Sequence, residues 1–226
     1  MKILVACEES QAVCTELRRL GHEAYSCDIG ECSGGHPEWH IKGDVLPLIN
    51  GFCQFDTMDG THHIVNQRWD MLFAFPPCTY LTNAGAVRMR VNGVIQQDRL
   101  EKAMQGREFF MKFFNADCDR IIIENPTPMK IVQLPPYSQA IQPYHHGHPY
   151  SKRTCLWLKG VDPLKPTCIM DHHEPYVNGG HKDHNGNYRR FRGRNERDQK
   201  TRSKTFPGIA KAMAEQWAGE NKQEEL

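Results

Sequence analysis

Two residues with side chains suited to chemistry follow two apolar segments of the chain. Cys78 ends the run FPPC, and Glu124 ends the run RIIIE. Because proline fixes its own φ and restricts the residue before it, Pro76 and Pro77 form a stiff lead-in that sets the direction of the thiol. An ionised thiol is a nucleophile, and a carboxyl group at the end of an apolar strand has a raised pKa and can donate a proton. The pair therefore predicts nucleophilic catalysis with an acid close by.

Both residues also have ordinary structural interpretations. A free cysteine in a reduced protein is usually buried and unreactive, and an acid at a sheet edge often pairs with a cation such as Arg120. A rigid cysteine and a protonatable acid on successive strand ends form a rarer coincidence than either residue alone. The remaining cysteines are expected to be buried free thiols: Cys7, Cys14, Cys27, Cys32, Cys53, Cys118, Cys155 and Cys168.

The composition is that of an ordinary globular protein. The 226 residues, 24% of them charged and with a formal net charge of +1, suffice for one sizeable core and a small insert. No apolar run approaches the roughly 18 residues that cross a bilayer, and the first residues lack a signal-peptide core. We expect a cytoplasmic protein without membrane contact, and a monomer is favoured. The odd count of nine cysteines and the lack of a C-x-x-C pair exclude the usual disulfide and zinc-ribbon frameworks.

Strand and helix patterns alternate along the first 126 residues. The expected strands are 2–6, 23–28, a short one ending near 43, 70–75, 120–126 and 154–160, and the expected helices are 10–21, 96–114 and 208–218. Ser10 is a plausible N-cap of the first helix. The alternation predicts an α/β fold with a doubly wound, mostly parallel, Rossmann-like sheet and helices on both faces.

A segment rich in His, Gly, Asn and Arg interrupts this pattern. We expect residues 1–162 to form the core, 163–204 a small irregular insert, and 205–226 a helix that returns to the core. The insert contains His172, His173, His181 and His184 near Cys168. Because their spacing lacks the paired-ligand frame of zinc sites, we expect no metal.

Two acids occupy positions suited to a nucleotide-like ligand. Ligands of parallel α/β sheets bind beyond the carboxyl ends of the strands. Asp28 lies about 20 residues past the first strand, where dinucleotide-binding folds place an acid on the ribose, and Asp44 could accept a hydrogen bond from an adenine amino group. Taken singly, either acid could merely initiate a turn.

These residues together resemble a known family. FPPC after one strand and ENP after the next are similar to motifs of the DNA cytosine methyltransferases that modify ring carbon 5, and ILVACEES, CDI, GDV, FPPCT and IIIENP follow the order of that family's first six motifs. Adenine-amino methyltransferases carry an aromatic residue after their two prolines, so Cys78 favours cytosine. The short chain also resembles stand-alone members carried by bacteriophages, which would place it in the host cytoplasm.

The resemblance implies a class I methyltransferase fold, S-adenosylmethionine as cofactor, and a mechanism. Cys78 would attack ring carbon 6 of a cytosine while Glu124 acts on ring nitrogen 3, and Asn125 would help to position the catalytic loop. Asp28 would hold the cofactor's ribose, with Ile29 beside the adenine and Asp44 at its amino group. In duplex DNA the base must swing out of the stack. The loop after the cysteine would close over it.

The first motif of this chain departs from the family, because ACEESQ contains no glycine. Cofactor contacts from that turn are therefore expected from Cys7, Glu8, Ser10 and Gln11. The further expected cofactor contacts are Val45, Phe75, Pro76, Ser203 and Thr205. Lys152, Arg153 or Thr154 in GHPYSKRTCLWL would substitute for the family's arginine motif, and Pro77 would support the nucleophile.

Arginines in two segments are candidates for nucleic-acid contact. They are Arg88 and Arg90 after the cysteine loop, and Arg189, Arg190, Arg192, Arg194 and Arg197 in the insert, with Tyr188 and Phe191 interleaved. Arginine bridges phosphates and aromatic rings stack on bases, although a solvated basic loop has the same composition. The leading hypothesis is methylation of cytosine carbon 5 in DNA. The alternatives are the same chemistry on RNA or a free cytosine nucleotide, and a non-catalytic nucleic-acid-binding homologue.

Overall fold

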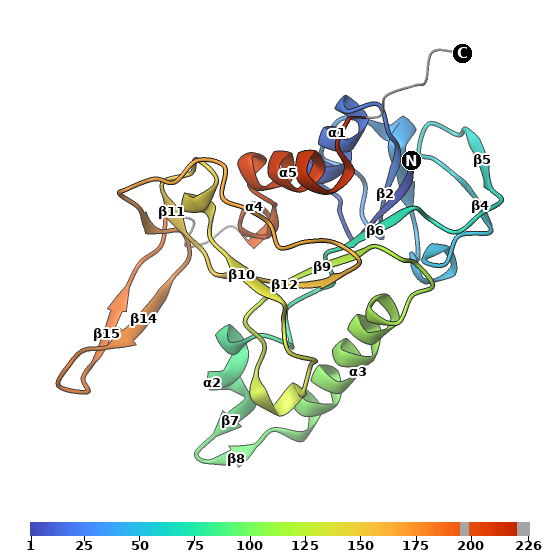
Figure 1. The fold of residues 1–226 in the computed structure, drawn as a ribbon. Coiled ribbons are helices and arrows are strands. Elements are labelled where there is room, and N and C mark those ends of the chain that lie inside the picture. The colour runs from blue at the N-terminus through green and yellow to red at the C-terminus, as the bar shows by residue number, and fades with distance from the viewer. Residues whose placement is uncertain (195–198, 221–226) are drawn as a thin grey trace.

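A computed structural model of the chain, describing residues 1–194 and 199–220, is built on one seven-stranded sheet (Figure 1). The strands are β1 (Lys2–Ala6), β2 (Glu23–Asp28), β3 (His40–Lys42), β6 (Met71–Ala74), β9 (Ile121–Pro126), β10 (Gln139–Ile141) and β12 (Thr154–Lys159). Their order is β10-β12-β9-β6-β1-β2-β3. The strands from β9 to β3 are parallel, whereas β12 is antiparallel to both of its neighbours. The expected mostly parallel, Rossmann-like α/β sheet is confirmed.

Helices cover both faces of the sheet. They are α1 (Ala12–Arg19), α3 (Gln97–Phe114) and α5 (Pro207–Met213). α1 and α5 lie on one face, where their buried side chains join those of Ile3 and Val5, and α3 lies on the other face with Leu4 and Ala6 (Figure 1). Successive side chains of a strand point to opposite faces, and both faces are covered, so residues 3–6 of β1, all of β6 and residues 121–123 of β9 are apolar.

Short elements complete the described residues. Two hairpins are formed by β4 (Cys53–Asp56) with β5 (His62–Val65), and by β7 (Arg90–Val91) with β8 (Val94–Ile95) after α2 (Ala86–Met89). Single turns are η1 (Pro37–Trp39), η2 (Leu46–Leu48), η3 (Asn83–Gly85), η4 (Lys130–Val132), η5 (Pro143–His145) and the π-helical η6 (Ala214–Ala218). Within the part of the chain that the structure describes, no helix has the length and apolar character needed to cross a membrane.

The segment between β12 and α5 contains three short strands, one of which pairs with a strand that precedes β12. β11 (Tyr150–Ser151) pairs with β13 (Glu174–Pro175), and β14 (Gly179–Lys182) forms an antiparallel ribbon with β15 (Tyr188–Phe191). The helix α4 (Gln199–Ser203) then leads into α5. Figure 1 shows the β14–β15 ribbon projecting away from the body of the molecule.

The strand register brings the predicted chemistry to one edge of the sheet. Ala6 pairs with Ala74, and Ala74 pairs with Ile123, so β1, β6 and β9 are aligned where they approach that edge. Because β12 is antiparallel to β9, it begins where β9 ends, with Thr154 opposite Pro126. Residues after β6, at the end of β9 and before β12 therefore meet at the same place.

Candidate active site

Cys78 lies in an extended loop that is fixed at both ends. The main-chain nitrogen of Phe75 donates to the oxygen of Ala6 at 3.0 Å, and the nitrogen of Leu81 donates to the oxygen of Cys78 at 3.1 Å. The thiol is half-buried, so it is neither sealed in the core nor fully in solvent.

Asn125 ties this loop to the neighbouring strand. Its side chain is 1% exposed, and Nδ2 donates to the main-chain oxygen of Pro76 at 2.8 Å. The loop after the cysteine is attached to the same segment, because the nitrogen of Met129 donates to the oxygen of Leu81 at 2.7 Å and that of Asn83 to Thr127 at 3.0 Å. Hydrogen bonds therefore hold the chain before and after Cys78 against the end of β9 and the residues that follow it.

The charge of Glu124 acts on the thiol of Cys78. Burial raises the pKa of the Cys78 thiol, the charge of Glu124 raises it further, and the charges of Lys152 and Arg202 oppose this effect. Burial also raises the pKa of Glu124, while Lys152 and a hydrogen bond from Thr154 lower it. Both groups therefore favour their protonated forms. Lys152 and Arg202 favour ionisation of the thiol, and Lys152 also favours ionisation of the carboxyl group.

A shallow pocket joins the acid to the segment before α5. Its lining residues are Glu124, Lys152, Thr154, Ser203, Lys204, Thr205, Phe206, Ile209 and Met213. Lys152 crosses this pocket, since its Nζ donates to the main-chain oxygen of Arg202 at 2.7 Å. The structure thus brings together Glu124, Lys152, Ser203 and Thr205. Arg153 is instead exposed and donates to the Tyr137 hydroxyl at 2.8 Å, outside the pocket lining.

Arg202 is a site residue that the sequence reasoning missed. Its Nε is buried and has no hydrogen-bond partner among the described residues, and its charge acts on Cys78. In the sequence Arg202 belongs to a basic run that does not distinguish it from its neighbours. The one local feature that could have indicated its place near the site is the adjacent Ser203, a predicted cofactor contact. The approach of this guanidinium to the thiol depends on how α4 folds back over the sheet.

The predicted nucleotide-binding residues gather at the ends of β1, β2 and β3. Burial raises the pKa of the Cys7 thiol, and the charges of Asp28 and Asp44 raise it further, so both acids lie near it. Ile29 is 83% exposed beside them, and Val45 is buried below. Both acids also stabilise turns, as the alternative interpretation predicts: Asp28 accepts from the nitrogen of Gly30 at 2.8 Å, and Asp44 from that of Leu46 at 3.0 Å.

The turn between β1 and α1 contains no glycine, yet two of its residues adopt the backbone conformation that glycine favours. Cys7 and Gln11 have φ values of 59° and 55°, in the left-handed region that glycine adopts without strain. The side chain of Gln11 compensates, because Nε2 donates to the oxygen of His36 at 2.8 Å and Oε1 accepts from its nitrogen at 3.1 Å. Gly34 of the same loop lies so close that an added Cβ would be 2.6 Å from the Cβ of Gln11. The loop before β3 therefore rests on the turn between β1 and α1.

Glu8, not Ser10, caps the first helix. Its carboxylate accepts from the nitrogens of Val13 at 2.7 Å and Cys14 at 3.1 Å. The helix begins at Ala12 after Gln11, and no side chain at the N-cap position makes a capping hydrogen bond. Burial raises the pKa of Glu8 to about 7 in spite of these two donors. These N–H groups of α1, an ordinary place for an anion, are thus occupied by the chain itself.

These residues fit the adenosyl half of S-adenosylmethionine. Two acids and an exposed apolar side chain suit a ribose, an amino group and an adenine face. The carboxylate of the cofactor cannot share the N–H groups that Glu8 already binds. A cation and hydroxyls are available in the pocket, where Lys204 donates from Nζ to the hydroxyl of Ser33 at 3.0 Å.

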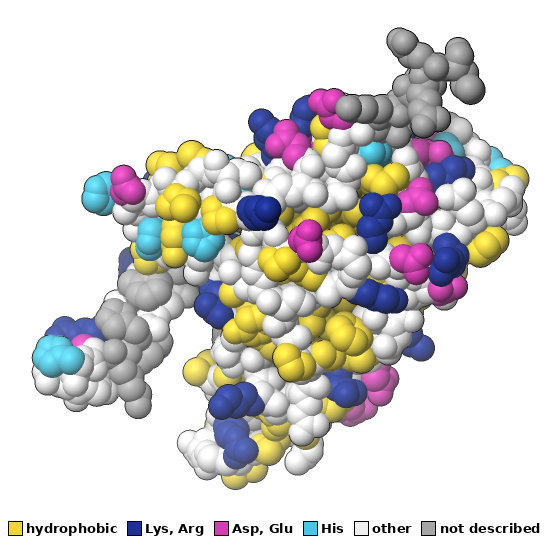
Figure 2. All heavy atoms as spheres, in the orientation of Figure 1, with side chains coloured by type: hydrophobic (Ala, Val, Ile, Leu, Met, Phe, Trp, Pro, Cys, Tyr) yellow, Lys and Arg dark blue, Asp and Glu magenta, His cyan; other side chains and the backbone are white. Residues whose placement is uncertain are grey.

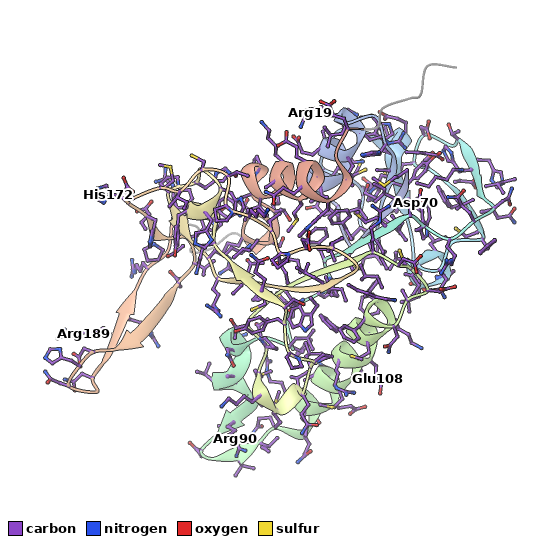
Figure 3. All side chains as sticks on the ribbon, viewed as in Figure 1. Arg19, Asp70, Arg90, Glu108, His172 and Arg189 are labelled. Atoms are coloured by element: carbon purple, nitrogen blue, oxygen red, sulfur yellow. The ribbon has the colours of Figure 1, made fainter. Side chains whose placement is uncertain are left out.

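The predicted nucleic-acid residues lie on two projections. Arg90 is on the β7–β8 hairpin and Arg189 is on the β14–β15 ribbon (Figure 3), and Figure 2 shows Lys and Arg side chains on both. Arg88 ends the turn of α2 before the first projection, and Arg190, Arg192 and Arg194 are exposed on or just after the second. Arg197 lies outside the described residues. The two groups of arginines do not form one continuous patch in this view.

Histidines near these elements have other roles. His146 bonds to the Thr167 hydroxyl at 3.1 Å, and His148 accepts from the nitrogen of Gly208 at 2.9 Å. His172 lies at the outer edge of the segment before β13 (Figure 3). Across residues 1–194 and 199–220, no three His, Cys, Asp or Glu side chains converge in a way that could hold a metal ion.

No known family profile matches the chain, and no curated protein matches it. A prophage-encoded protein from E. coli, described as a DNA modification methyltransferase, is 13% identical with a TM-score of 0.43 over 75% of this chain and 52% of that one. The Entamoeba histolytica methyltransferase EhMeth is 14% identical with a TM-score of 0.41 over 76% and 56% of the two chains. A DNMT2 mutant from Spodoptera frugiperda is 15% identical with a TM-score of 0.33 over 78% and 55%. The chain spans about half the length of these structures, and its chemistry must be argued from its own site.

Proposed function

We propose that this chain is an S-adenosylmethionine-dependent methyltransferase that modifies carbon 5 of cytosine in DNA. The observation that carries the proposal is the electrostatic effect of Glu124 on the Cys78 thiol, with Lys152 acting on both groups. A nucleophile, an acid and a cation at one sheet edge suit a ring that must be attacked on one atom and protonated on another. We also propose the division into a core (1–162), a recognition insert (163–204) and a returning helix (205–226).

The proposed reaction uses the two central residues in sequence. The thiolate of Cys78 forms a bond to ring carbon 6, Glu124 delivers a proton to ring nitrogen 3, and the electron pair displaced from the ring double bond develops at carbon 5. Once carbon 5 has received a methyl group, a water molecule takes the carbon 5 proton, and the electron pair of that C–H bond re-forms the ring double bond. The sulfur leaves carbon 6 as the Cys78 thiolate, and ring nitrogen 3 returns its proton to the Glu124 carboxylate. The burial that raises the pKa of Glu124 supports this assignment, because it favours the acid form that the protonation needs.

The bound cofactor would supply an electrophilic methyl group. Asp28 is proposed to hold the ribose hydroxyls, and Ile29 and Asp44 to contact the adenine. Because Glu8 occupies the first N–H groups of α1, the carboxylate end is assigned to the pocket that contains Ser203, Lys204 and Thr205. With this assignment the methyl donor would lie between the two acids, Asp28 and Asp44, and the thiol of Cys78 after β6.

The test is methyl transfer by the purified chain from labelled S-adenosylmethionine to four substrates offered separately. Duplex DNA, single-stranded DNA, RNA and dCMP distinguish the leading proposal from the same chemistry on another substrate. Digestion to nucleosides and mass spectrometry should give 5-methylcytosine from DNA, and Cys78→Ser should abolish it. Cys168→Ser is the matched control, since Cys168 is an exposed free thiol and is absent from the groups that act on Cys78 and Glu124. Unchanged methylation by Cys78→Ser would overturn the nucleophile assignment.

One observation favours a second candidate function. The capped N-terminus of α1 removes a common anion site from the cofactor region, as expected for a protein that binds nucleic acid without catalysis. Calorimetry with S-adenosylmethionine discriminates the two. Saturable binding supports the methyltransferase, whereas no binding together with salt-sensitive DNA affinity supports the non-catalytic protein.

A further inference from the structure

The residues directly after Cys78 pack against the helix α3. Leu81 is 1% exposed, and its side chain lies against Gly106 in the interior of α3, where an added Cβ would be 3.1 Å from Cδ2 of Leu81. Glycine inside a helix is unfavourable relative to alanine, so Gly106 has a packing reason, which is the room that it leaves for Leu81. The helix is therefore fitted to the first residues of this loop.

Arg99, near the start of α3, makes a second contact with the same loop. The carbon of its guanidinium group lies 5.1 Å from the centroid of the Tyr80 ring, in cation–π geometry. Gly85 is also close, because a Cβ added there would be 3.2 Å from Nη2 of Arg99 and 3.4 Å from the main-chain oxygen of Thr79. One guanidinium group thus lies beside both Tyr80 and Gly85, near the two ends of residues 79–85.

The position of Arg99 is not explained by an ion pair. Its Nε is buried and has no hydrogen-bond partner among the described residues, and no described acid pairs with its charge. A buried donor without a partner is unfavourable, so the side chain must be held by other contacts. The ring of Tyr80 and the space left by Gly85 are the contacts that hold it.

Arg99 is connected to the nucleophile through the main chain. The charges that act on the Cys78 thiol are those of Glu124, Lys152 and Arg202. Tyr80 is two residues after Cys78, and the nitrogen of the next residue, Leu81, donates to the oxygen of Cys78 at 3.1 Å. A displacement of Tyr80 would therefore also displace the main chain that carries the thiol.

We propose that Arg99 is a positioning residue that fixes the direction of the Cys78 thiol by holding Tyr80 and residues 79–85 against α3. This inference rests on the proposed function and adds a second support of the nucleophile. Asn125 holds the chain before Cys78, and Arg99 holds the chain after it. The resemblance predicts a loop that closes over the base. In this chain the movement is confined to the residues after Gly85, while residues 79–85 stay in place.

The test compares methylation kinetics with alkylation of Cys78 in the full-length chain. Arg99→Met removes the cation–π contact. A misplacement of about 1 Å can reduce a rate on the order of 100-fold, so kcat should fall by up to that factor with KM for DNA nearly unchanged. Iodoacetamide should modify Cys78 faster, because a released loop loses part of the burial that raises the pKa of the thiol. A lost charge effect would slow alkylation instead, so slower or unchanged alkylation would overturn the proposal.

Variants of Tyr80 identify the contact through which Arg99 acts. Tyr80→Phe keeps the ring face and should behave like the unmodified chain, whereas Tyr80→Leu should reproduce Arg99→Met. Arg99→Lys keeps a cation over the ring and should recover part of kcat. Because the two side chains form one contact, the double variant with Arg99→Met and Tyr80→Leu should be no slower than either single variant. Additive losses would show that the residues act separately and would overturn the proposal.

Two further measurements separate positioning from loss of the fold. Urea unfolding establishes that each variant is folded, and hydrogen exchange of the Leu81 amide, which bonds to the oxygen of Cys78, should be faster in folded Arg99→Met. Unchanged exchange would contradict the proposal. Lys112→Met, an exposed cation further along α3, is the matched control and should change neither kcat nor alkylation.

The same measurements distinguish failure of this inference from failure of the proposed function. If the unmodified chain methylated no substrate while alkylation and exchange responded to Arg99→Met as expected, the proposed function would be wrong and the support of the loop by Arg99 would stand. Methylation with an unchanged kcat in Arg99→Met would refute the positioning role alone.

Discussion

The side chain of Asn125 donates a hydrogen bond of 2.8 Å to the main-chain oxygen of Pro76, two residues before Cys78. The donor follows Glu124 directly, so one strand end supplies both the acid and the support of the nucleophile loop. A single displacement of β9 would therefore move both groups together. The bond links two strands that are parallel neighbours in the sheet, β6 and β9.

Removing this donor should slow chemistry more than it weakens binding. Asn125→Ala leaves the buried oxygen of Pro76 without its partner, which costs about 1–3 kcal/mol, and frees the loop to move. A misplacement of about 1 Å can reduce the rate on the order of 100-fold, so we expect kcat to fall by that factor with KM for DNA nearly unchanged. Steady-state methylation kinetics measure both constants.

The control for this change is Asn115→Ala, which alters an exposed asparagine at the end of α3. Its kcat should equal that of the unmodified chain. If Asn125→Ala raised KM and spared kcat, the residue would act in binding and the positioning role would be wrong.

Glu124→Gln should remove the acid without removing the shape of the side chain. Glutamine can donate a hydrogen bond but cannot deliver a proton, and general acid catalysis contributes roughly 100- to 10,000-fold. Glu124 acts in its protonated form and Cys78 as its thiolate, and burial raises the pKa of both groups, so the rate depends on the product of two opposite protonation states. We expect a bell-shaped profile of kcat/KM against pH for the unmodified chain.

In Glu124→Gln the alkaline decline of this profile should disappear along with most of the rate. Thr154→Val serves as the comparison, because it removes a hydrogen bond to the acid while leaving the carboxyl group in place. The limb of its profile that reports Glu124 should shift to higher pH, since that hydrogen bond lowers the pKa of the carboxyl group. An identical limb in all three proteins would assign the titration to another group.

The sequence was sufficient to find residues whose position follows from a single strand. Cys78, Glu124 and Asp28 each lie at or just beyond the end of an apolar run, and the parallel register brings such ends to one edge. The order of the elements also predicted helices on both faces of the sheet. These inferences need only local periodicity and one general rule of α/β folds.

Other features depend on contacts that no local pattern encodes. Arg202 belongs to α4, far from Cys78 in the sequence, yet its charge acts on the thiol, and Lys152 donates from Nζ to the main-chain oxygen of Arg202. Glu8 replaced Ser10 as the helix cap because the chain turns through left-handed conformations at Cys7 and Gln11. The β14–β15 ribbon was expected as irregular chain, since glycine, histidine and arginine give no alternating apolar pattern.

Glu8 should give the chain an unusual dependence of stability on pH. Burial raises its pKa from 4.5 to about 7, so the folded chain binds this proton more tightly than the unfolded chain does. The stabilising contribution is full below pH 4.5 and is lost as the pH rises through about 7. A shift of this size corresponds to roughly 3 kcal/mol in the free energy of unfolding.

Urea unfolding at a series of pH values across this window measures the effect. Glu8→Gln should lack this part of the slope, whatever its stability at one pH. Glu16→Gln, which alters a surface ion pair with Arg19 on the same helix, should keep it. Equal slopes in Glu8→Gln and the unmodified chain would contradict the assigned titration.

The two cations beside Cys78 should control how readily its thiol is alkylated. Burial and the charge of Glu124 raise the pKa of Cys78, and Lys152 and Arg202 lower it, so Lys152→Met or Arg202→Met should leave less thiolate at a given pH. Because only the thiolate reacts, iodoacetamide should modify Cys78 more slowly, by up to roughly tenfold for about 1.4 kcal/mol of lost charge interaction. Mass spectrometry of the peptide follows the rate.

Replacing Glu124 should change the pKa of the Cys78 thiol in the opposite direction. Glu124→Gln removes a charge that raises the pKa of the thiol, so alkylation of Cys78 should accelerate in this variant while methylation falls. Cys168, which is exposed, reports the reagent's reactivity in every sample, and Lys159→Met, at the exposed end of β12, is the matched cation control. Rates for Cys78 that stay constant relative to Cys168 in all variants would show that neither the cations nor the acid act on the thiol, and the proposed pairing of nucleophile and acid would be wrong.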